Sequence, residues 1–326
     1  MTAYSNEGGW FDIDNVRFQK GYPEKIGGWQ KRSSNSFLGT CRALHPWVSL
    51  NRDQYVGVGT NLKYYIDEGG FYNDVTPLRL TTSAGAITFA ATNGSSELTV
   101  THSSHGAVVN DFVTYSGAAS LGGLITAAVL NQEYYVTEVV DTNSYKIKAR
   151  TADTSIYDIT YEGNLNPSLV AANGSDTGNG GGSVVGAYQI NTGLDIGVSG
   201  AGWGTGNWAR GAWGSASSDP IVINTLRLWS HDNFGEDLLI NVRDGGIYYW
   251  DETNTLANRA VDITSLAGSD SAPTIAKQIL VSDRDRHVIA FGCDTEANPG
   301  VQDPLAIRFS DQESLTNWRT QTPIQQ

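Results

Sequence analysis

One pattern of short apolar and aromatic runs, separated by polar or glycine turns, recurs along this chain. Two copies fill the second half, at residues 226–266 and 279–310, and a third lies near the front, at residues 54–78. Short runs rich in β-branched and aromatic residues between such turns are typical of strands. One unit of this size cannot bury both faces of its own sheet. The repeat therefore predicts several small sheets that pack on one another.

The front copy and the first late copy end on the same motif, Asp-(Val or Ile)-Thr-x-Leu, at residues 74–78 and 262–266. Each time, the motif follows a strand that contains a Tyr-Tyr pair. Units of about 40–45 residues built from short strands are typical of β-propeller blades. We therefore expect an all-β fold with propeller-like blades, with other segments inserted between them.

The composition supports this fold class. Among 326 residues there are 37 glycines, 9 tryptophans and 15 tyrosines, and 40% of the residues are hydrophobic. No stretch keeps an apolar period of about 3.6 residues, so very little helix is expected. No run of about 18 apolar residues occurs, so no membrane span is expected. The first residues lack a secretory signal pattern, so we expect synthesis and retention in a cytoplasm until assembly or release.

The formal net charge of −13 argues against a general nucleic-acid-binding surface, because phosphate contacts require lysine and arginine. It is compatible with a surface that DNA passes without binding. Cys41 and Cys293 are the only cysteines, and their apolar, strand-like surroundings predict two buried free thiols instead of a disulfide. With five scattered histidines they offer no zinc-ligand spacing, so neither a metal nor a cofactor is expected.

Residues 81–190 break the repeat and predict a separate small β-barrel. Strand-like runs at residues 85–89 and 98–101 flank an Asn93-Gly94 pair, which favours a hairpin turn. The expected domains are propeller-like blades at residues 1–80, the inserted barrel at residues 81–190, and further blades, an incomplete set, at residues 191–326. The glycine-rich run at residues 178–182 predicts a flexible exit from the barrel.

The inserted segment is acidic, which predicts a position on an outer surface. There it could contact a neighbouring subunit, a fibre or a host surface. Its acidic residues Asp111, Glu133, Glu138, Asp141, Asp153, Asp158, Glu162 and Asp176 outnumber the basic residues Lys146, Lys148 and Arg150. His105 precedes a strand in this segment, and a turn histidine explains it better than a metal ligand or a base.

Four stretches carry a resemblance to a known family. They are residues 15–29, which begin Asn-Val-Arg-Phe and end Lys-Ile-Gly-Gly-Trp, residues 226–237, residues 245–251, and residues 303–311. With their surroundings, at about residues 8–80 and 200–318, they resemble tail proteins of tailed bacteriophages. The nearest types are the packaged-DNA stabilisation and tail-nozzle (tail tubular) proteins of short-tailed phages.

The resemblance implies a β-propeller-like protein that forms a ring at the distal end of the portal and adaptor, without catalytic residues. Residues 81–190 are similar to a small β-barrel module of phage tail proteins, which is known by its likeness to the first catalytic cysteine half-domain of ubiquitin-activating enzymes. No cysteine lies in these residues, so this likeness implies only a fold. Three units are too few to close a propeller of about four to eight blades. Either the chain is a short version, or other subunits complete the ring, or further blades have diverged.

Two patterns raise other functions. Trp203, Trp208 and Trp213 recur every five residues, and aromatics at this spacing can form a sugar-stacking platform, although packing of a long loop explains them more simply. The candidate carboxylates for glycoside hydrolysis are Asp232, Glu236, Asp237, Asp283 and Asp285. Aspartates that cap their own turns explain these residues better, and residues 283–286 are expected to form a self-paired hairpin turn.

Residues 310–318 come near the Ser-x-Asp-x-Gly-x-x-Trp box of sialidases, which staples a turn and is not catalytic. They miss its spacing and its central glycine. No phosphate loop, nucleophile elbow or metal cluster occurs in the sequence. We therefore expect no enzyme, and a polysaccharide depolymerase is the least favoured of the functions considered.

The sequence predicts a structural virion protein of a phage tail, made in the host cytoplasm. A homo-oligomeric ring would continue the DNA channel, retain the packaged DNA and permit its ejection. Its expected neighbours are the adaptor or portal and the tail fibre or spike proteins. Carboxylates facing the lumen would repel DNA, so that it passes without specific binding. The alternative is a host-recognition or glycan-binding tail module that uses the three tryptophans.

Overall fold

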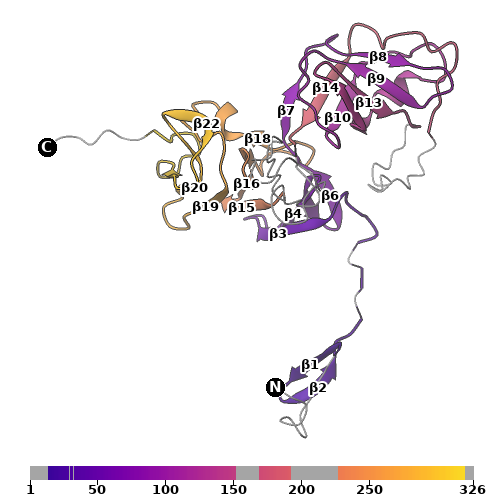
Figure 1. Ribbon diagram of the computed structural model, residues 1–326. Coiled ribbons are helices and arrows are strands. Elements are labelled where there is room, and N and C mark those ends of the chain that lie inside the picture. Colours follow the sequence, from indigo (N-terminus) through magenta and orange to yellow (C-terminus); the bar gives the residue numbers. More distant parts are fainter. Residues whose placement is uncertain (1–13, 29, 32, 152–168, 192–226, 320–326) are drawn as a thin grey trace, which may run out of the picture. The chain divides into compact units, whose positions relative to one another are not determined.

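The computed structural model describes residues 14–28, 30–31, 33–151, 169–191 and 227–319 (Figure 1). Within these ranges the chain is almost entirely β-structure, as expected. Helical structure in the described part is limited to α1 (Ala127–Leu130) and a 3₁₀ turn, η3 (Ile263–Ser265). None of the described helices is long and apolar enough to cross a membrane.

Residues 1–34 form a unit of their own. Its described part contains β1 (Val16–Gln19) and β2 (Tyr22–Lys25), which pair as an antiparallel hairpin. An ion pair of 3.1 Å joins Arg17 and Glu24 across the two strands. Phe18 and Tyr22 are exposed, because a two-stranded ribbon offers no second layer to cover them.

The second unit begins at Asn35 and contains three antiparallel sheets in which neighbouring strands follow one another in the sequence, apart from a hairpin inserted before the last strand of the third sheet. The front sheet comprises β3 (Cys41–Val48), β4 (Gln54–Thr60), β5 (Tyr64–Glu68) and β6 (Phe71–Asp74). The middle sheet comprises β15 (Trp229–Phe234), β16 (Asp237–Val242), β17 (Ile247–Trp250) and β18 (Val261–Asp262). The rear sheet comprises β19 (Gln278–Val281), β20 (Val288–Phe291) and β23 (Ile307–Phe309). The sequence between β20 and β23 forms a separate two-stranded hairpin of β21 (Asp294–Thr295) and β22 (Asn298–Gln302). These are the three units of the sequence repeat.

The middle sheet packs on the front sheet with one face and on the rear sheet with the other. Successive side chains of a strand point to opposite faces. Trp229 of β15 accordingly donates from Nε1 to the carbonyl of Thr60 in the front sheet, at 2.6 Å. Ser230, the next residue, accepts at 3.1 Å from the backbone N–H of Ile279 in the rear sheet. Alternation along one strand therefore links three sheets.

Close approach between the front and middle sheets depends on a glycine. A Cβ at Gly59 of β4 would lie 2.6 Å from Cδ1 of Trp229. The indole occupies the space that any larger residue would need, and its hydrogen bond to Thr60 fixes it there. A glycine in a strand often marks such a close approach.

The repeated Asp-x-Thr closure is a hydrogen-bonded turn in both copies. Asp74 Oδ1 accepts from the N–H of Thr76 at 3.0 Å, and Asp262 Oδ1 accepts from the N–H of Thr264 at 2.8 Å. An aspartate that bonds the backbone two residues onward fixes the direction in which the chain leaves a strand. The shared motif therefore encodes a shared exit from the last strand of each sheet.

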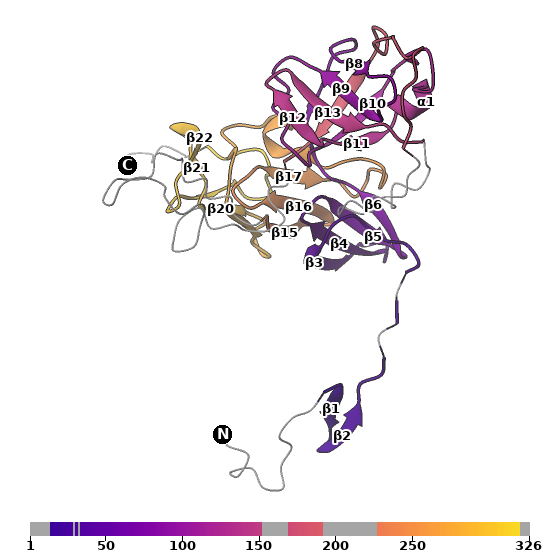
Figure 2. The same ribbon diagram turned by 45° about the vertical axis from the view of Figure 1, so that its right-hand side comes forward.

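Residues between the front and middle sheets form the inserted β module, defined here as residues 78–189. One of its two four-stranded sheets contains β7 (Leu78–Thr81), β10 (Phe112–Ser116), β11 (Glu133–Tyr135) and β14 (Val185–Gln189). The other contains β8 (Thr88–Ala91), β9 (Glu97–Thr101), β12 (Glu138–Asp141) and β13 (Ser144–Lys148). Figure 2 shows the strands of this module around a common interior, which a single apolar core fills. The β8–β9 hairpin turns at Asn93-Gly94 as predicted, with a φ of 82° at Gly94.

Two local expectations are wrong. The glycine run at residues 178–182 is not a free exit, because Ala119 donates from its backbone to Gly180 at 2.7 Å and Phe89 donates to Asn179 at 3.0 Å. Cys41 is exposed at the start of β3, whereas Cys293 is buried as predicted, and both thiols are free. The burial of Cys41 was predicted wrongly because apolar neighbours in a strand do not reveal which face of that strand another sheet covers.

Candidate functional site

The three candidate glycan-stacking residues, Trp203, Trp208 and Trp213, lie in residues 192–226, outside the described part of the chain. Their platform stays a prediction. No group of three or more His, Cys, Asp or Glu side chains suited to a metal ion occurs in the described ranges.

The structure assigns bonds to three of the five carboxylates considered for glycoside hydrolysis. Asp232 Oδ2 accepts from the N–H of Val281 at 2.8 Å and so joins the middle sheet to the rear sheet. Glu236 Oε1 accepts from the N–H of Leu50 at 2.7 Å and joins the middle sheet to the front sheet. Asp237 accepts from the Tyr249 hydroxyl at 2.6 Å and from the N–H of Glu252 at 2.9 Å. Each carboxylate holds a strand or a turn.

The other two candidates, Asp283 and Asp285, lie in the turn between β19 and β20, as predicted. Within this described turn no ion pair joins the aspartates to Arg284 or Arg286, so the expected self-pairing is wrong. Charged side chains at an exposed turn gain little from pairing in water, because side-chain entropy opposes it.

The stretch from Ser310 to Trp318 forms a stapled turn. Asn317 donates from Nδ2 to Asp311 Oδ2 at 2.5 Å, and Trp318 donates from Nε1 to the Leu315 carbonyl at 2.8 Å. The Trp318 side chain is buried in the cluster between the middle and rear sheets. The stretch therefore closes a turn over a buried tryptophan.

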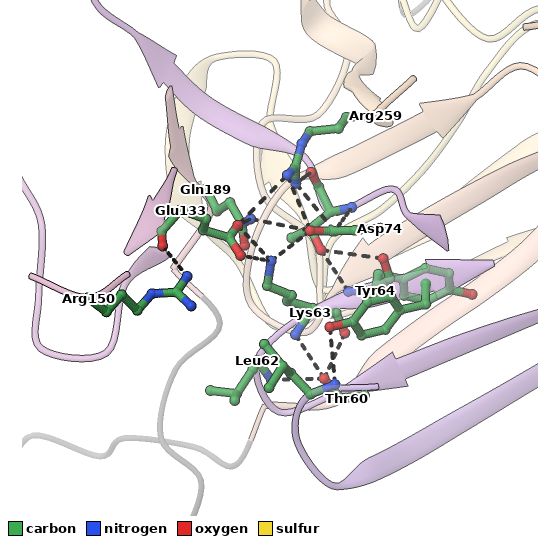
Figure 3. A network of polar contacts seen from close by, with 12 residues as sticks. Thr60, Leu62, Lys63, Tyr64, Asp74, Glu133, Arg150, Gln189 and Arg259 are labelled. Atoms are coloured by element: carbon green, nitrogen blue, oxygen red, sulfur yellow. Dashed lines mark hydrogen bonds and ion pairs between the residues drawn. The ribbon is translucent and has the colours of Figure 1, made fainter. Parts of the chain in front are cut away.

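A buried lysine forms the centre of a charged cluster that joins several parts of the second unit (Figure 3). Lys63 is only 2% exposed, and its Nζ lies 2.7 Å from Asp74 Oδ2 and 2.7 Å from Glu133 Oε1. It also lies 4.8 Å from the centroid of the Phe112 ring. Lys63 and Asp74 belong to the front sheet and its turns, whereas Glu133 and Phe112 belong to the inserted β module. We call these residues and their partners below the Lys63 network.

The turn before β5 aims the lysine inward. Thr60 Oγ1 accepts from the N–H of Leu62 at 3.1 Å and from the N–H of Lys63 at 2.8 Å. Its backbone N–H also donates to the Lys63 carbonyl at 2.8 Å. A threonine that bonds its own turn in this way holds the backbone in a fixed conformation, so the side chain of Lys63 leaves the turn in one direction.

Three more residues complete the Lys63 network. Gln189 donates from Nε2 to Glu133 Oε1 at 2.6 Å, and Arg150 donates to the Glu133 carbonyl at 2.7 Å. Arg259, from the loop between β17 and β18, lies 3.2 Å from Asp74 Oδ2. Three separate parts of the second unit therefore meet at one buried set of charges: the front sheet, the inserted module and the loop of the middle sheet.

The electrostatics of Asp74 follow from this surrounding. Burial alone would raise its pKa, but the Lys63 and Arg259 cations and the hydrogen bonds from Lys63 and Thr76 outweigh burial and lower the pKa to about 2. A carboxyl group whose pKa falls on folding stabilises the folded state above its ordinary pKa. That contribution is lost as the pH falls from about 4 toward 2.

The hydrogen bonds of the Lys63 network indicate a structural role in joining parts of the fold. An ammonium group has three donors and no acceptor, and those of Lys63 are directed at Asp74 and Glu133. Sequence analysis missed this cluster. The available signal was a lysine beside Tyr64 in an otherwise apolar strand, but its partners are far away in the sequence.

A second polar chain crosses the core of the inserted module. His102 Nδ1 lies 2.9 Å from the Tyr188 hydroxyl, which lies 2.9 Å from that of Tyr145, which in turn lies 2.5 Å from that of Tyr115. Burial raises the pKa of Tyr115 and Tyr145, so these phenols stay protonated. Each hydroxyl bonds a neighbour, which removes the cost of an unpaired buried polar group.

Three acidic residues of the module do not contribute to its surface charge. Asp111, Glu133 and Asp176 are buried. Asp176 accepts from the N–H groups of Gly123, Leu124 and Ile125 at 2.8–3.0 Å. Backbone donors and fixed cations compensate for the removal of these carboxylates from water, and sequence alone does not reveal which carboxylates find them.

Asp111 is a buried carboxylate with only partial compensation. Its Oδ2 accepts from the N–H of Val108 at 3.0 Å and lies 3.7 Å from Arg79. Burial raises its pKa from 3.8 to about 6, although the bond from Val108 and the charge of Arg79 oppose this. A pKa that rises on folding means that stability falls as the pH rises from about 4 to 6.

Replacing Asp111 with asparagine is therefore expected to stabilise the protein at pH 8 by at most about 3 kcal/mol, the free energy of the pKa difference. At pH 4 the two proteins should be equally stable, because the wild-type carboxyl is then largely protonated. Urea unfolding at pH 4, 6 and 8 measures the difference, with the exposed Asp283→Asn as control. A constant difference from pH 4 to 8 would contradict this account of Asp111.

Comparison with protein-family models gave no match. Comparison with curated proteins gave none either. Among solved structures, "Phage phi92 endosialidase" aligns with 86% of this chain at 15% sequence identity and a TM-score of 0.21. The chain spans 36% of the length of that protein. A superposition at this TM-score does not establish a shared fold, so it assigns neither a family nor an activity.

Proposed function

We propose that this chain is a structural protein of a bacteriophage tail, in which several copies form a ring that continues the DNA channel. The observation that carries the proposal is the use of the candidate carboxylates. Asp232, Glu236 and Asp237 link sheets and turns to one another. An architecture that uses its acidic residues as connectors suits a load-bearing part. The family resemblance of residues 8–80 and 200–318 supports a position in a phage tail.

In this proposal the ring holds packaged DNA and releases it on infection. A net charge of −13 suits a channel wall that DNA passes without binding, because like charges repel. The neighbours of the ring would be the adaptor or portal above it and fibre or spike proteins around it. The protein would be made in the host cytoplasm and would end in the virion.

The test is to locate the protein in particles. An epitope inserted at Gly174, where a Cβ would meet no atom within 4 Å, is labelled on intact virions for electron microscopy. The same epitope at Gly94, a hairpin tip with equally open surroundings, is the matched second site. Label in a ring around the tail supports the proposal. Label at fibre tips would favour host recognition, and particles without the protein would overturn a virion role.

A separate assay addresses enzymatic activity. Purified protein is incubated with host surface polysaccharide, and released sugar is measured. The proposal predicts no release. Release of sugar by the purified protein would replace the structural role with a depolymerase.

A further inference from the structure

A pocket of about 420 Å³ lies between the middle and rear sheets, where β15 and β19 begin and β16 and β20 end. Its volume is within the range of about 300–1,000 Å³ that is usual for ligand sites. The described residues that line it include Arg243, Lys277 and Gln278, and none of them is an aspartate or a glutamate. This lining is unusual for a chain with a formal net charge of −13. We call the pocket the Arg243 pocket.

Arg243 supplies the first donors of the Arg243 pocket. It directly follows β16, and its backbone N–H donates to the carbonyl of Leu228 at 2.9 Å, which fixes it beside the start of β15. Its side-chain Nε is buried and has no hydrogen-bond partner among the described residues. The Nε–H and a neighbouring Nη–H of a guanidinium form a fork that matches two oxygens of a carboxylate or phosphate. Arg243 is therefore suited to bind an oxyanion.

Lys277 and Gln278 supply further donors from the rear sheet. The N–H of Lys277 donates to the carbonyl of Phe291 at 3.0 Å. A Cβ at Gly292, where φ is 55°, would lie 3.1 Å from Cβ of Lys277, so the glycine leaves room for the stem of the lysine. Within the described ranges, neither Lys277 nor Gln278 has a side-chain hydrogen bond or ion pair. Donors from both sheets are therefore available on the wall of the pocket.

The carboxylates beside the pocket in the sequence have bonds of their own. Asp244 Oδ1 accepts from Gln302 Nε2 at 3.0 Å. Asp303 Oδ1 accepts from the N–H of Leu305 at 3.0 Å. Neither aspartate lines the pocket, whereas Arg243 and Lys277 do. Two cations without a facing carboxylate attract an anion, and walls of low dielectric strengthen this attraction.

We propose that the Arg243 pocket binds a small molecule that carries a phosphate or carboxylate group. Two oxygens of the anion accept from the fork of Arg243, and the ammonium of Lys277 adds a second cation. The apolar side chains of Leu228 and Phe291 in the lining contact the body of an organic ligand. Because Arg243 and Lys277 belong to different sheets, a bound anion also links the middle sheet to the rear sheet. This site goes beyond the proposed function and does not rest on it.

Inorganic phosphate and glucuronate test the two sources of the anion, and glucose is the neutral control. Each is titrated into the full chain, labelled with nitrogen-15 and deuterated, at pH 7 and at an ionic strength kept constant with sodium chloride. The backbone amide signals of Lys277, Gln278 and Gly292 should shift saturably with at least one anion and not with glucose. Saturation with phosphate alone supports a phosphate ligand, and saturation with glucuronate alone supports a carboxylate ligand.

Substitutions assign the binding to the two cations. Arg243→Gln and Lys277→Gln should each weaken it at least about tenfold, the usual effect of losing a hydrogen bond between charged groups. Arg243→Lys keeps the charge but loses the fork, so it should also bind more weakly. The matched control is Arg284→Gln, which removes one charge from the exposed turn between β19 and β20 and should bind like the wild type. Far-ultraviolet circular dichroism verifies folding.

Lys277→Gln keeps the test decisive if an Arg243 variant does not fold, because Lys277 is exposed. A second measurement is the thermal unfolding midpoint, which the bound anion should raise in the wild type and not in Lys277→Gln. The site would be overturned if neither anion caused saturable shifts, or if glucose caused the same shifts. Equal weakening in Lys277→Gln and Arg284→Gln would also overturn it, since only net charge would then matter. None of these outcomes bears on the ring, which label on virions tests.

Discussion

Replacing Lys63 with methionine is expected to lower the free energy of unfolding by about 3–5 kcal/mol, the usual loss when one partner of a buried ion pair is removed. Methionine fills a similar volume but leaves Glu133 and Asp74 without the ammonium between them. Glu133 is 7% exposed, so water compensates it poorly. Urea unfolding at pH 7 measures the loss.

The control is Lys146→Met. Lys146 also contacts two carboxylates, Glu97 and Glu138, at 2.8 Å, but all three side chains are solvent-accessible. Exposed pairs of this kind contribute about 0–1 kcal/mol each. Equal losses in the two variants would show that the carboxylates around Lys63 are as well solvated as those around Lys146.

A double variant identifies the origin of the loss. Combining Lys63→Met with Glu133→Gln removes one of the orphaned charges and is expected to recover part of the stability lost in Lys63→Met. A hydrogen bond from Gln189 would still have an acceptor at position 133. A loss equal to the sum of the two single losses would indicate that packing, not an unpaired charge, explains the effect.

The local sequence pattern predicted the sheets because strands and turns depend mainly on interactions between residues that are close in the sequence. The hairpin at Asn93-Gly94 needs only its own turn chemistry, and the Asp-x-Thr closures need only a carboxylate and an N–H two residues onward. These interactions join residues that lie within the same short sequence motif. Their positions could therefore be predicted without knowledge of the fold.

The Lys63 network could not be predicted, because its seven members come from distant parts of the sequence. Asp74, Glu133, Gln189 and Arg259 reach Lys63 or its partners only after the module has folded onto the front sheet. For the same reason, the sequence does not reveal that Asp111 and Asp176 are buried. Whether a carboxylate is exposed depends on donors that the rest of the chain supplies.

The turn at residues 310–318 combines local interactions with contacts to residues that are distant in the sequence. Its bond from Asn317 to Asp311 is local, although the sequence analysis did not predict a stapled turn there. Its anchoring is not local. The N–H of Trp318 donates to the carbonyl of Asp270 at 3.0 Å, and Asp270 pairs with Asn317 in a parallel bridge. The indole is 2% exposed in the cluster that joins the middle and rear sheets.

Replacing Trp318 with alanine is therefore expected to cost about 3–5 kcal/mol, as for other buried tryptophans. Removal of the buried indole leaves a cavity, and the hydrogen bond from Nε1 of Trp318 to the Leu315 carbonyl is lost. Trp318→Phe should cost less, because the ring still fills part of the site. Phe71→Ala is the control, since Phe71 is 68% exposed; it should stay within about 0.5 kcal/mol of the wild type.

The position of the loss within the protein is as informative as its size. If Trp318 closes the cluster between the middle and rear sheets, amides of β19 and β20 should exchange faster in Trp318→Ala, while those of the inserted module keep their protection. Cooperative units of a protein can open separately. Equal acceleration in both regions would mean that the sheets and the module unfold as one unit. In that case the Lys63 network, which joins the module to the front sheet, would transmit the loss, and Lys63→Met should then restore separate exchange.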